Sequence, residues 1–395
     1  MQLVAYGAQD IYLTGNPQIT FFKVVYRRHT NFAMESIEQT FNGSVDLNKR
    51  VTATISRNGD LVKDMWLECR FGTVAGTCVY GLGNALVKQV EVEIGGQLID
   101  RQYGEWMNIW SELSVPEGKR TVYDAMVGNF TTGSNIPTQL DVPLQFWFNR
   151  NPGLALPLIA LQYHEVKLNL DLESQAVLDS ANALTLDACK LWVDYIYLDT
   201  DERRRFAQVS HEYLIEQVQF TGDESLSTGS NNIKLNFNHP VKELVWVAQS
   251  ENQQRKDHND SEPCQFTTMR NGNDSSAKLQ LNGHDRFTAR RVEYFTNVQP
   301  YKHHSHGPRA NRPAGAEGTG AATQTHAQHI NVYSFALNPE EHQPSGTCNF
   351  SRIDNATLVL ADVPAALNSG VLKVFAVNYN VLRVMSGMGG LAYSN

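Results

Sequence analysis

The sequence contains one long internal repeat, and this repeat limits the possible folds more than any other feature. Phe41-Asn-Gly43 corresponds to Phe220-Thr-Gly222, and Val62-Lys-Asp-Met-Trp66 corresponds to Val241-Lys-Glu-Leu-Val245, both 179 positions apart. Three further matches lie 187 positions apart: Glu91–Gly96 with Lys278–Gly283, Phe148 with Phe335, and Pro152 with Pro339. A final match, Leu191-Trp-Val193 with Leu372-Lys-Val374, lies 181 positions apart. Several matches that share an offset indicate a tandem duplication.

The middle of the chain marks the boundary between the two copies. Leu191–Leu198 is rich in aromatic and β-branched residues in an alternating pattern, which predicts a strand. Asp199–Phe206 is charged, costly to bury, and predicts a connector held by local ion pairs. We therefore predict an N-terminal arm (1–25), a first domain (26–203), a connector (204–215) and a second domain (216–395).

Length and composition agree with two soluble domains. A chain of 395 residues exceeds one ordinary core. Hydrophobic residues make up 42% and charged residues 19%, and no run approaches the roughly 18 apolar residues of a membrane span. No signal peptide is recognisable, so synthesis in the host cytoplasm is expected. A formal net charge of −8 argues against broad, direct binding of nucleic acid.

Short alternating segments separated by turn residues predict an all-β fold. Examples are Val51–Ser56 and Tyr163–Leu172, and few helices fit except one over Glu105–Leu113 and one near Pro152. Two polar insertions, Ser250–Ser276 and His303–Gln328, predict exposed loops. Strands at this spacing with long loops predict two tandem eight-stranded jelly-roll β-sandwiches with short helices in the loops.

No pattern of residues predicts catalysis or a cofactor. The five cysteines have no paired spacing, and His303-His304-Ser305-His306 lacks the carboxylate or thiolate that would complete a metal site. No phosphate loop and no nucleophile elbow occur, and Gly387-Met-Gly-Gly390 is interpreted as flexible C-terminal chain. Among several Asn-x-Ser/Thr motifs, Asn259 and Asn273 lie in an insertion predicted to be exposed and are the candidate glycosylation sites.

Long motifs along the whole chain resemble the major capsid proteins of nucleocytoplasmic large DNA viruses, most of all those of phycodnaviruses that infect chlorella. The motifs are Gly7–Phe32, Ser56–Asp60, Pro152–Val166, Trp192–Ile196, Leu279–Gly283, Gln343–Asn355 and Tyr379–Tyr393. The resemblance implies a double jelly roll whose homotrimers form pseudo-hexagonal capsomers that tile an icosahedral shell, with glycans on the outer loops. The two insertions depart from the family pattern, so glycan positions do not follow from it.

We therefore predict a non-enzymatic structural protein of the virion, whose partners are two further copies, neighbouring capsomers and minor capsid proteins. The N-terminal arm, through Phe21, Phe22 and Tyr26, is predicted to contact another jelly roll or a neighbour. Two alternatives share the expected fold. One is a carbohydrate-binding tandem β-sandwich, with Trp246 and Tyr294 as aromatic platforms, and the other is a minor or vertex capsid paralogue.

Overall fold

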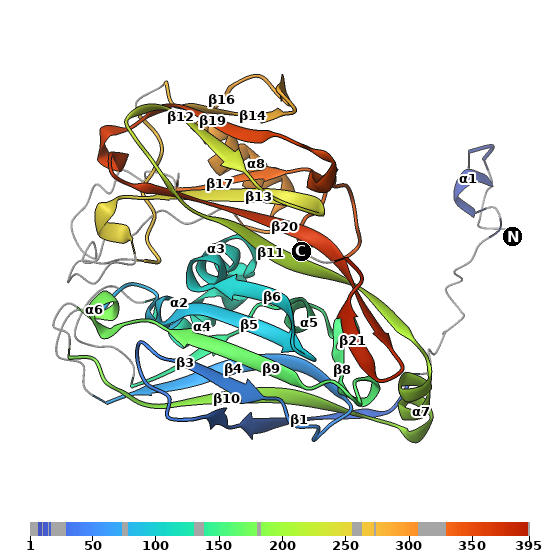
Figure 1. Cartoon of the computed structure of the whole chain (residues 1–395). Coiled ribbons are helices and arrows are strands. Elements are labelled where there is room, and N and C mark those ends of the chain that lie inside the picture. Colours follow the sequence, from blue (N-terminus) through green and yellow to red (C-terminus); the bar gives the residue numbers. More distant parts are fainter. Residues whose placement is uncertain are drawn as a thin grey trace, which may run out of the picture.

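The computed structural model describes residues 7–9, 11–14, 16, 29–72, 78–129, 138–179, 183–254, 263–271, 274–306 and 329–393. They form two β-sandwiches stacked one on the other, the first below and the second above in Figure 1. A single short helix, α1 (Ile11–Thr14), precedes the first sandwich. No helix among these residues is long and apolar enough to cross a membrane.

The first sandwich consists of two antiparallel sheets. One has the order β1 (Phe32–Gln39), β10 (Leu186–Leu198), β4 (Leu61–Phe71) and β7 (Gln139–Pro143), with β8 (Leu156–Pro157) also paired to β4. The other has the order β2 (Phe41–Asn42), β3 (Arg50–Thr54), β9 (Val166–Leu172), β5 (Val87–Ile94) and β6 (Gln97–Tyr103). The predicted strand over Leu191–Leu198 is confirmed as the greater part of β10.

The second sandwich repeats this arrangement. One sheet has the order β11 (His211–Ser225), β20 (Val371–Met385), β13 (Pro240–Gln249) and β17 (Ile330–Ser334), joined by β18 (Cys348–Asn349) and β21 (Met388–Leu391). The other has the order β12 (Gly229–Leu235), β19 (Ala356–Val363), β14 (Ser276–Leu281) and β15 (His284–Asp285), and β16 (Arg290–Arg291) also pairs with β14. The long strands of the two sandwiches correspond in chain order: the first strand of each sandwich pairs with its last long strand, and equivalent strands take equivalent places in the sheets. This is the jelly-roll arrangement.

The repeat in the sequence therefore corresponds to equivalent strands and turns. The matched segments Glu91–Gly96 and Lys278–Gly283 each end a strand and enter a two-residue hairpin turn, Gly95-Gly96 in one roll and Asn282-Gly283 in the other. All four residues have positive φ, between 51° and 85°. Such turns favour Asn and Gly, because most side chains are strained in the left-handed region.

Short helices occupy the connections. The first roll carries α2 (Leu82–Leu86), α3 (Gly104–Ser114), α4 (Glu117–Val127), α5 (Trp147–Arg150), α6 (Gln175–Leu178), η1 (Pro152–Leu154) and η2 (Leu158–Ala160). The second carries η3 (Glu251–Gln253), the π-helix η4 (Tyr294–Val298), α8 (Gln299–His303), η5 (Phe350–Arg352) and η6 (Ala365–Leu367). The helices predicted over Glu105–Leu113 and near Pro152 are confirmed as α3 and η1.

The segment between the rolls is more regular than expected. Asp199 accepts a hydrogen bond from the Thr200 amide at 2.8 Å and begins α7 (Thr200–Gln208), after which β11 starts at His211. The predicted connector at 204–215 is thus occupied by the end of α7 and the start of β11. Arg203 pairs with Asp60 of the first roll at 3.0 Å, rather than with its acidic neighbours. The domain boundaries stay a prediction.

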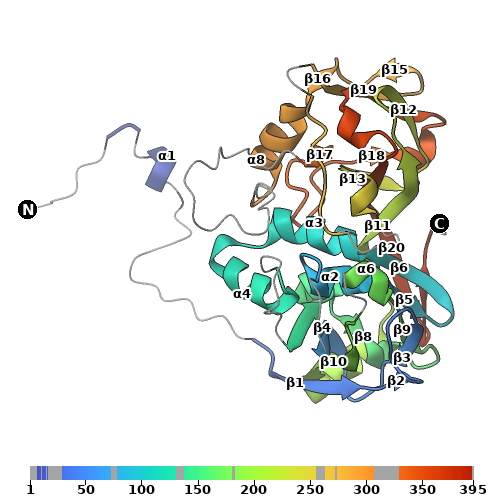
Figure 2. The same cartoon turned by 90° about the vertical axis from the view of Figure 1, so that its left-hand side faces the viewer.

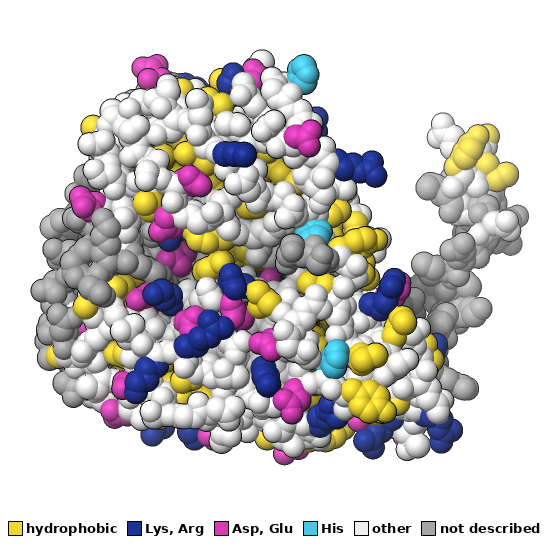
Figure 3. Space-filling view, in the orientation of Figure 1, with side chains coloured by type: hydrophobic (Ala, Val, Ile, Leu, Met, Phe, Trp, Pro, Cys, Tyr) yellow, Lys and Arg dark blue, Asp and Glu magenta, His cyan; other side chains and the backbone are white. Residues whose placement is uncertain are grey.

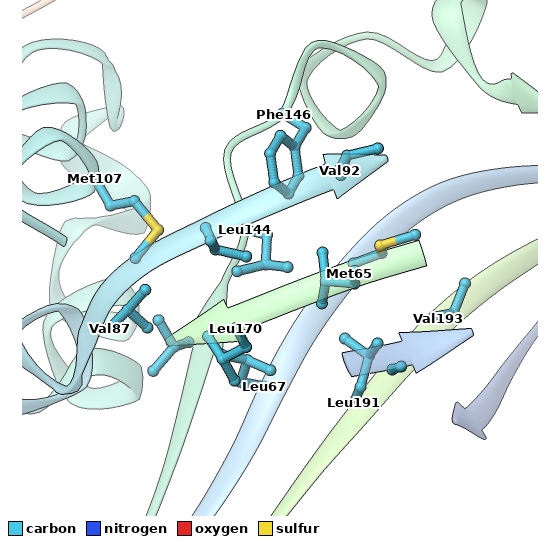
Figure 4. Packing of buried hydrophobic residues seen from close by; sticks show 14 of the residues in the cluster. Met65, Leu67, Val87, Val92, Met107, Leu144, Phe146, Leu170, Leu191 and Val193 are labelled. Atoms are coloured by element: carbon cyan, nitrogen blue, oxygen red, sulfur yellow. The ribbon is translucent and has the colours of Figure 1, made fainter. Parts of the chain in front are cut away.

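Each roll has a hydrophobic core, and the core of the first roll also takes in Leu382 and Val384 from the end of the second. Inward-facing side chains of β4, β5, β9 and β10 meet between the sheets of the first roll, and Figure 4 shows Met65, Leu67, Val92, Leu170 and Val193 among them. Burial alternates along β4 because successive side chains point to opposite faces of a strand. A separate cluster that includes Trp246, Phe295 and Leu358 fills the second roll. In the insertion predicted to be exposed, Phe266 is in fact buried between the rolls.

Candidate assembly surfaces

A third hydrophobic cluster joins the two rolls. Trp106, Ile109, Trp110 and Leu113 recur on one face of α3, and this face packs on the sheet of β11, β20, β13 and β17, as the position of α3 between the rolls in Figures 1 and 2 shows. The ring centroids of Trp106 and Phe375 lie 5.4 Å apart. Because this seam excludes water from large aromatic side chains of both rolls, it fixes one roll on the other.

Hydrogen bonds between β6 of the first roll and β11 of the second also fix the orientation of the two rolls. Asp100 accepts a hydrogen bond from the Val218 amide at 3.2 Å, and Gln217 donates one to the Ile99 carbonyl. Burial raises the pKa of Asp100 to about 7, and hydrogen bonds from Val218, Gln102 and Arg101 with the charge of Arg150 only partly oppose this. A carboxyl group therefore titrates near neutrality inside the contact between the rolls.

A buried group of charges lies beside this contact. Glu216 of β11 pairs with Lys242 at 2.7 Å and with Arg150 of α5 at 3.2 Å, and the guanidinium of Arg150 lies 4.1 Å from the Trp110 ring centroid. Desolvation lowers the pKa of Arg150, and the charge of Glu216 opposes that change. Since α5 belongs to the first roll and β11 to the second, Glu216 links the rolls through a cation from each.

A second buried group lies within the second roll. His304 is enclosed, and its Nε2 lies 3.0 Å from Glu243 while its Nδ1 lies 3.0 Å from Glu340. Burial alone would lower the pKa of His304, but the two carboxylates outweigh it and raise the pKa to about 9. Burial would raise the pKa of Glu340, but hydrogen bonds from His304 and Ser305 outweigh it and lower the pKa. Two carboxylates at 3.0 Å, one beside each ring nitrogen, favour the charged imidazolium over the neutral ring.

The end of the second roll grips the first roll through a hairpin. β20 turns through Ser386-Gly387 into β21, and the Gly389 amide donates to His164 at 3.1 Å while the Tyr163 amide donates to the Gly387 carbonyl at 2.9 Å. The interpretation of Gly387–Gly390 as flexible chain is therefore wrong, because β21 pairs with β20 on one side and contacts the first roll on the other. The glycines suggested a flexible segment, whereas in the fold they allow β21 to lie close to the first roll.

Exposed apolar side chains gather at this hairpin. Tyr163, Met385 and Met388 form what we call the hairpin patch, and Tyr163 is 76% exposed. Hydrophobic side chains collect at the lower right of Figure 3, over the region of β8, β21 and α7 in Figure 1. The edge strand β1 adds exposed Phe32 and Met34. Clustered exposed apolar side chains, as at the hairpin patch, are typical of contact sites between proteins.

The predicted site residues have different outcomes. Phe21, Phe22, Tyr26, Asn259 and Asn273 lie outside the described residues, so the arm and the glycosylation sites stay predictions. Two aromatic residues were predicted as platforms for carbohydrate binding. The prediction for Trp246 is wrong, because this residue is buried against Phe295 in the core of the second roll. Tyr294, by contrast, lines an open hollow at the surface.

Residues of both rolls match known capsid protein families. Residues 20–199 match the family described as major capsid protein N-terminus, and residues 202–313 and 317–390 match the large eukaryotic DNA virus major capsid protein. The chain belongs to this family. It is a structural protein of the virion capsid shell of a large DNA virus, and the resemblance stated from its motifs is confirmed.

Individual relatives cover the chain from end to end. It is 59% identical to the major capsid protein of Pyramimonas orientalis virus and 47% identical to that of Paramecium bursaria Chlorella virus 1, with 100% of this chain and 99% of each relative covered. The solved structure described as the PBCV-1 virus capsid, a quasi-atomic model, superposes with a TM-score of 0.78 at 41% identity, covering 95% of this chain and 100% of that one. The double jelly-roll fold is thereby confirmed.

A structural neighbour of low sequence identity shares the fold. The Faustovirus major capsid protein is 12% identical in the superposed region, yet it has a TM-score of 0.75 and covers 96% of this chain and 94% of its own. These similar proteins are structural capsid proteins rather than enzymes. The relatives named above are major capsid proteins, which favours that function over the minor or vertex paralogue.

Proposed function

We propose that three copies of this chain form a pseudo-hexagonal capsomer and that these capsomers tile an icosahedral shell. The observation that carries the proposal is the duplication itself, since two rolls with the same sheet order lie in one chain. Three copies around a threefold axis then present six similar units. A trimer of this kind can occupy a position of sixfold symmetry in a lattice.

The contact between the rolls supports the proposal because a hexagonal outline needs a constant angle between them. The aromatic seam around α3 and the ion pairs of Glu216 join the rolls at two separate places, and the hairpin of β20 and β21 joins them at a third. Rolls held at several separated points move together. Each copy therefore contributes two units in a fixed relation.

Neighbouring capsomers and minor capsid proteins are the proposed partners of the exposed surfaces. Two parts of the chain are proposed to supply apolar contact area. One is the N-terminal arm, through Phe21, Phe22 and Tyr26, and the other is the hairpin patch. Individual contacts between capsomers need not be strong, because many simultaneous contacts give high avidity. Asn259 and Asn273 are proposed to carry covalent glycans, and no residue is assigned a catalytic role.

The first experiment measures the mass of the purified chain by light scattering, followed by negative-stain imaging of the same peak. A mass of three times 44.2 kDa with hexagonal outlines supports the capsomer. A stable monomer or dimer without hexagonal particles would overturn the proposed trimer. Mass spectrometry of virion-derived protein tests the glycans, since Asn259→Gln and Asn273→Gln each remove one glycan mass if those sites are occupied.

A truncated chain tests the proposed arm. Deletion of residues 1–25 is expected to leave folded trimers, because none of the described core residues lies in this segment, but these trimers should not tile. The full-length variant Phe21→Ser/Phe22→Ser, which keeps the length of the arm, should show the same defect. Shells of normal size and yield from both variants would contradict a function of the arm in assembly.

A further inference from the structure

A hollow lined by arginines lies on the second roll, on the side away from the first roll. Its volume is about 610 Å³, and the residues that line it include Arg270, Arg290, Arg291, Glu293, Tyr294 and Val298. β16, which contributes Arg290 and Arg291, lies at the outer end of the second roll in both Figure 1 and Figure 2. Neither the repeat nor the contact between the rolls accounts for this feature.

The electrostatics of the hollow oppose those of the whole chain. Three arginines and one acidic residue, Glu293, line the hollow, whereas the chain carries a formal net charge of −8. Glu293 pairs with Arg270 at 3.2 Å, and Arg290 and Arg291 are both exposed on β16. Because arginine presents a planar fork of donors to carboxylate, sulfate and phosphate groups, the hollow favours an anion.

An aromatic ring is held rigidly beside these cations. The hydroxyl of Tyr294 accepts a hydrogen bond from Gln299 at 2.8 Å, and its ring meets the buried ring of Phe295 edge to face at 5.1 Å. The guanidinium of Arg290 lies 5.5 Å from the centroid of the Tyr294 ring. Tyr294 also begins the π-helix η4, a rare conformation that is frequent at functional sites.

We propose that this hollow binds an acidic saccharide, one that carries sulfate or carboxylate groups on a chain of sugar rings. The arginines bind the anionic groups, while Tyr294 and Val298 offer apolar surface to the C–H face of a ring. The volume lies within the range of about 300 to 1,000 Å³ typical of small-molecule sites.

Two other anionic ligands fit the hollow less well. No glycine lines it, so it lacks the backbone cradle that a phosphate loop provides. β16 has only two residues, which is too short to add an acidic peptide as a further strand. The inference goes beyond capsid assembly, and it does not depend on the proposed trimer.

The test measures binding to the full-length protein by calorimetry at low salt, using a sulfated hexasaccharide, an oligogalacturonate and an uncharged cello-oligosaccharide of equal length. Binding of both acidic probes but not of the neutral one is expected, and the affinity should fall as salt is added. Arg290→Gln/Arg291→Gln should weaken binding of the acidic probes by about tenfold or more, because it removes both charged donors of β16.

The matched control is Arg204→Gln/Arg352→Gln, which removes two exposed arginines outside the hollow and should leave the affinity unchanged. Light scattering of every variant verifies that its assembly state is that of the parent. Equal weakening by both double variants would overturn the proposal, as would tighter binding of a single-stranded oligonucleotide than of either saccharide. To distinguish the sources of the saccharide, binding to host-cell wall glycans is compared with binding to glycans released from the virion.

Discussion

The enclosed imidazolium of His304 predicts a loss of stability at alkaline pH. In the unfolded chain this group has a pKa near 6.5, and in the fold Glu243 and Glu340 outweigh burial and raise it to about 9. A group whose pKa is raised on folding stabilises the fold fully below the unfolded pKa, and this contribution disappears as the pH rises through the folded pKa. The affected window is therefore pH 6.5 to 9.

The magnitude follows from the size of the shift. At about 1.4 kcal/mol per pKa unit, a change from 6.5 to about 9 corresponds to about 3 kcal/mol in the free energy of unfolding. His304→Gln can donate from its amide nitrogen but carries no charge, so it loses this pH-dependent part. The difference in unfolding free energy between the parent and His304→Gln should shrink by about 3 kcal/mol between pH 6.5 and pH 9.

Urea denaturation followed by tryptophan fluorescence at several pH values measures this difference. His284→Gln is the matched control, because His284 is an exposed histidine of the same roll and its replacement should leave the pH profile unchanged. If the difference between the parent and His304→Gln stays constant from pH 6.5 to 9, His304 is not charged in the fold, and the reasoning from its two carboxylate contacts is refuted.

Three further changes test the contacts between the rolls. Trp106→Ala should cost about 3–5 kcal/mol in unfolding free energy, because Trp106 is fully buried in the seam, and urea denaturation measures it. The unfolding free energy of Asp100→Asn relative to the parent should increase by about 4 kcal/mol as the pH rises from about 4 to 7, since burial raises the pKa of this carboxyl to about 7; a pH-independent difference would contradict this. Gly389→Ala should loosen the contact between the hairpin and the first roll, because an added Cβ would lie 2.5 Å from the Leu161 side chain. Gly118→Ala is the control, since its Cβ meets no atom within 4 Å, and hydrogen exchange of β21 amides compares the two variants.

Local patterns in the sequence contain most of the information about the fold. Alternation predicts β10, and the repeat places β4 and β13 exactly 179 positions apart, at Leu61 and Pro240. Spacing of aromatic residues predicts α3. These features depend on residues close together in the sequence and on the spacing of apolar residues, so they can be predicted without a structure.

The contacts between the rolls depend on distant residues and were not predictable in this way. Glu216 and Lys242 are charged residues within strands, where the sequence alone predicts that they face water, and their ion pair forms only once β11 and β13 lie in one sheet. Arg290 and Arg291 resemble an ordinary charged turn. A polar insertion likewise hides the burial of Phe266 from sequence analysis, because its cluster is built from α3 of the first roll and four strands of the second, which come together only in the fold.

The hairpin of β20 and β21 also sets an order of events during synthesis. It follows all other strands in the sequence, yet it binds Tyr163 and His164 of the first roll. A nascent chain can form most of the first core on the ribosome, but Leu382 and Val384 of β20 join that core only after the second roll has been translated. The two rolls are therefore fully joined only after the second has emerged from the ribosome, and a partly made chain lacks the fixed relation between the rolls on which the proposed capsomer depends.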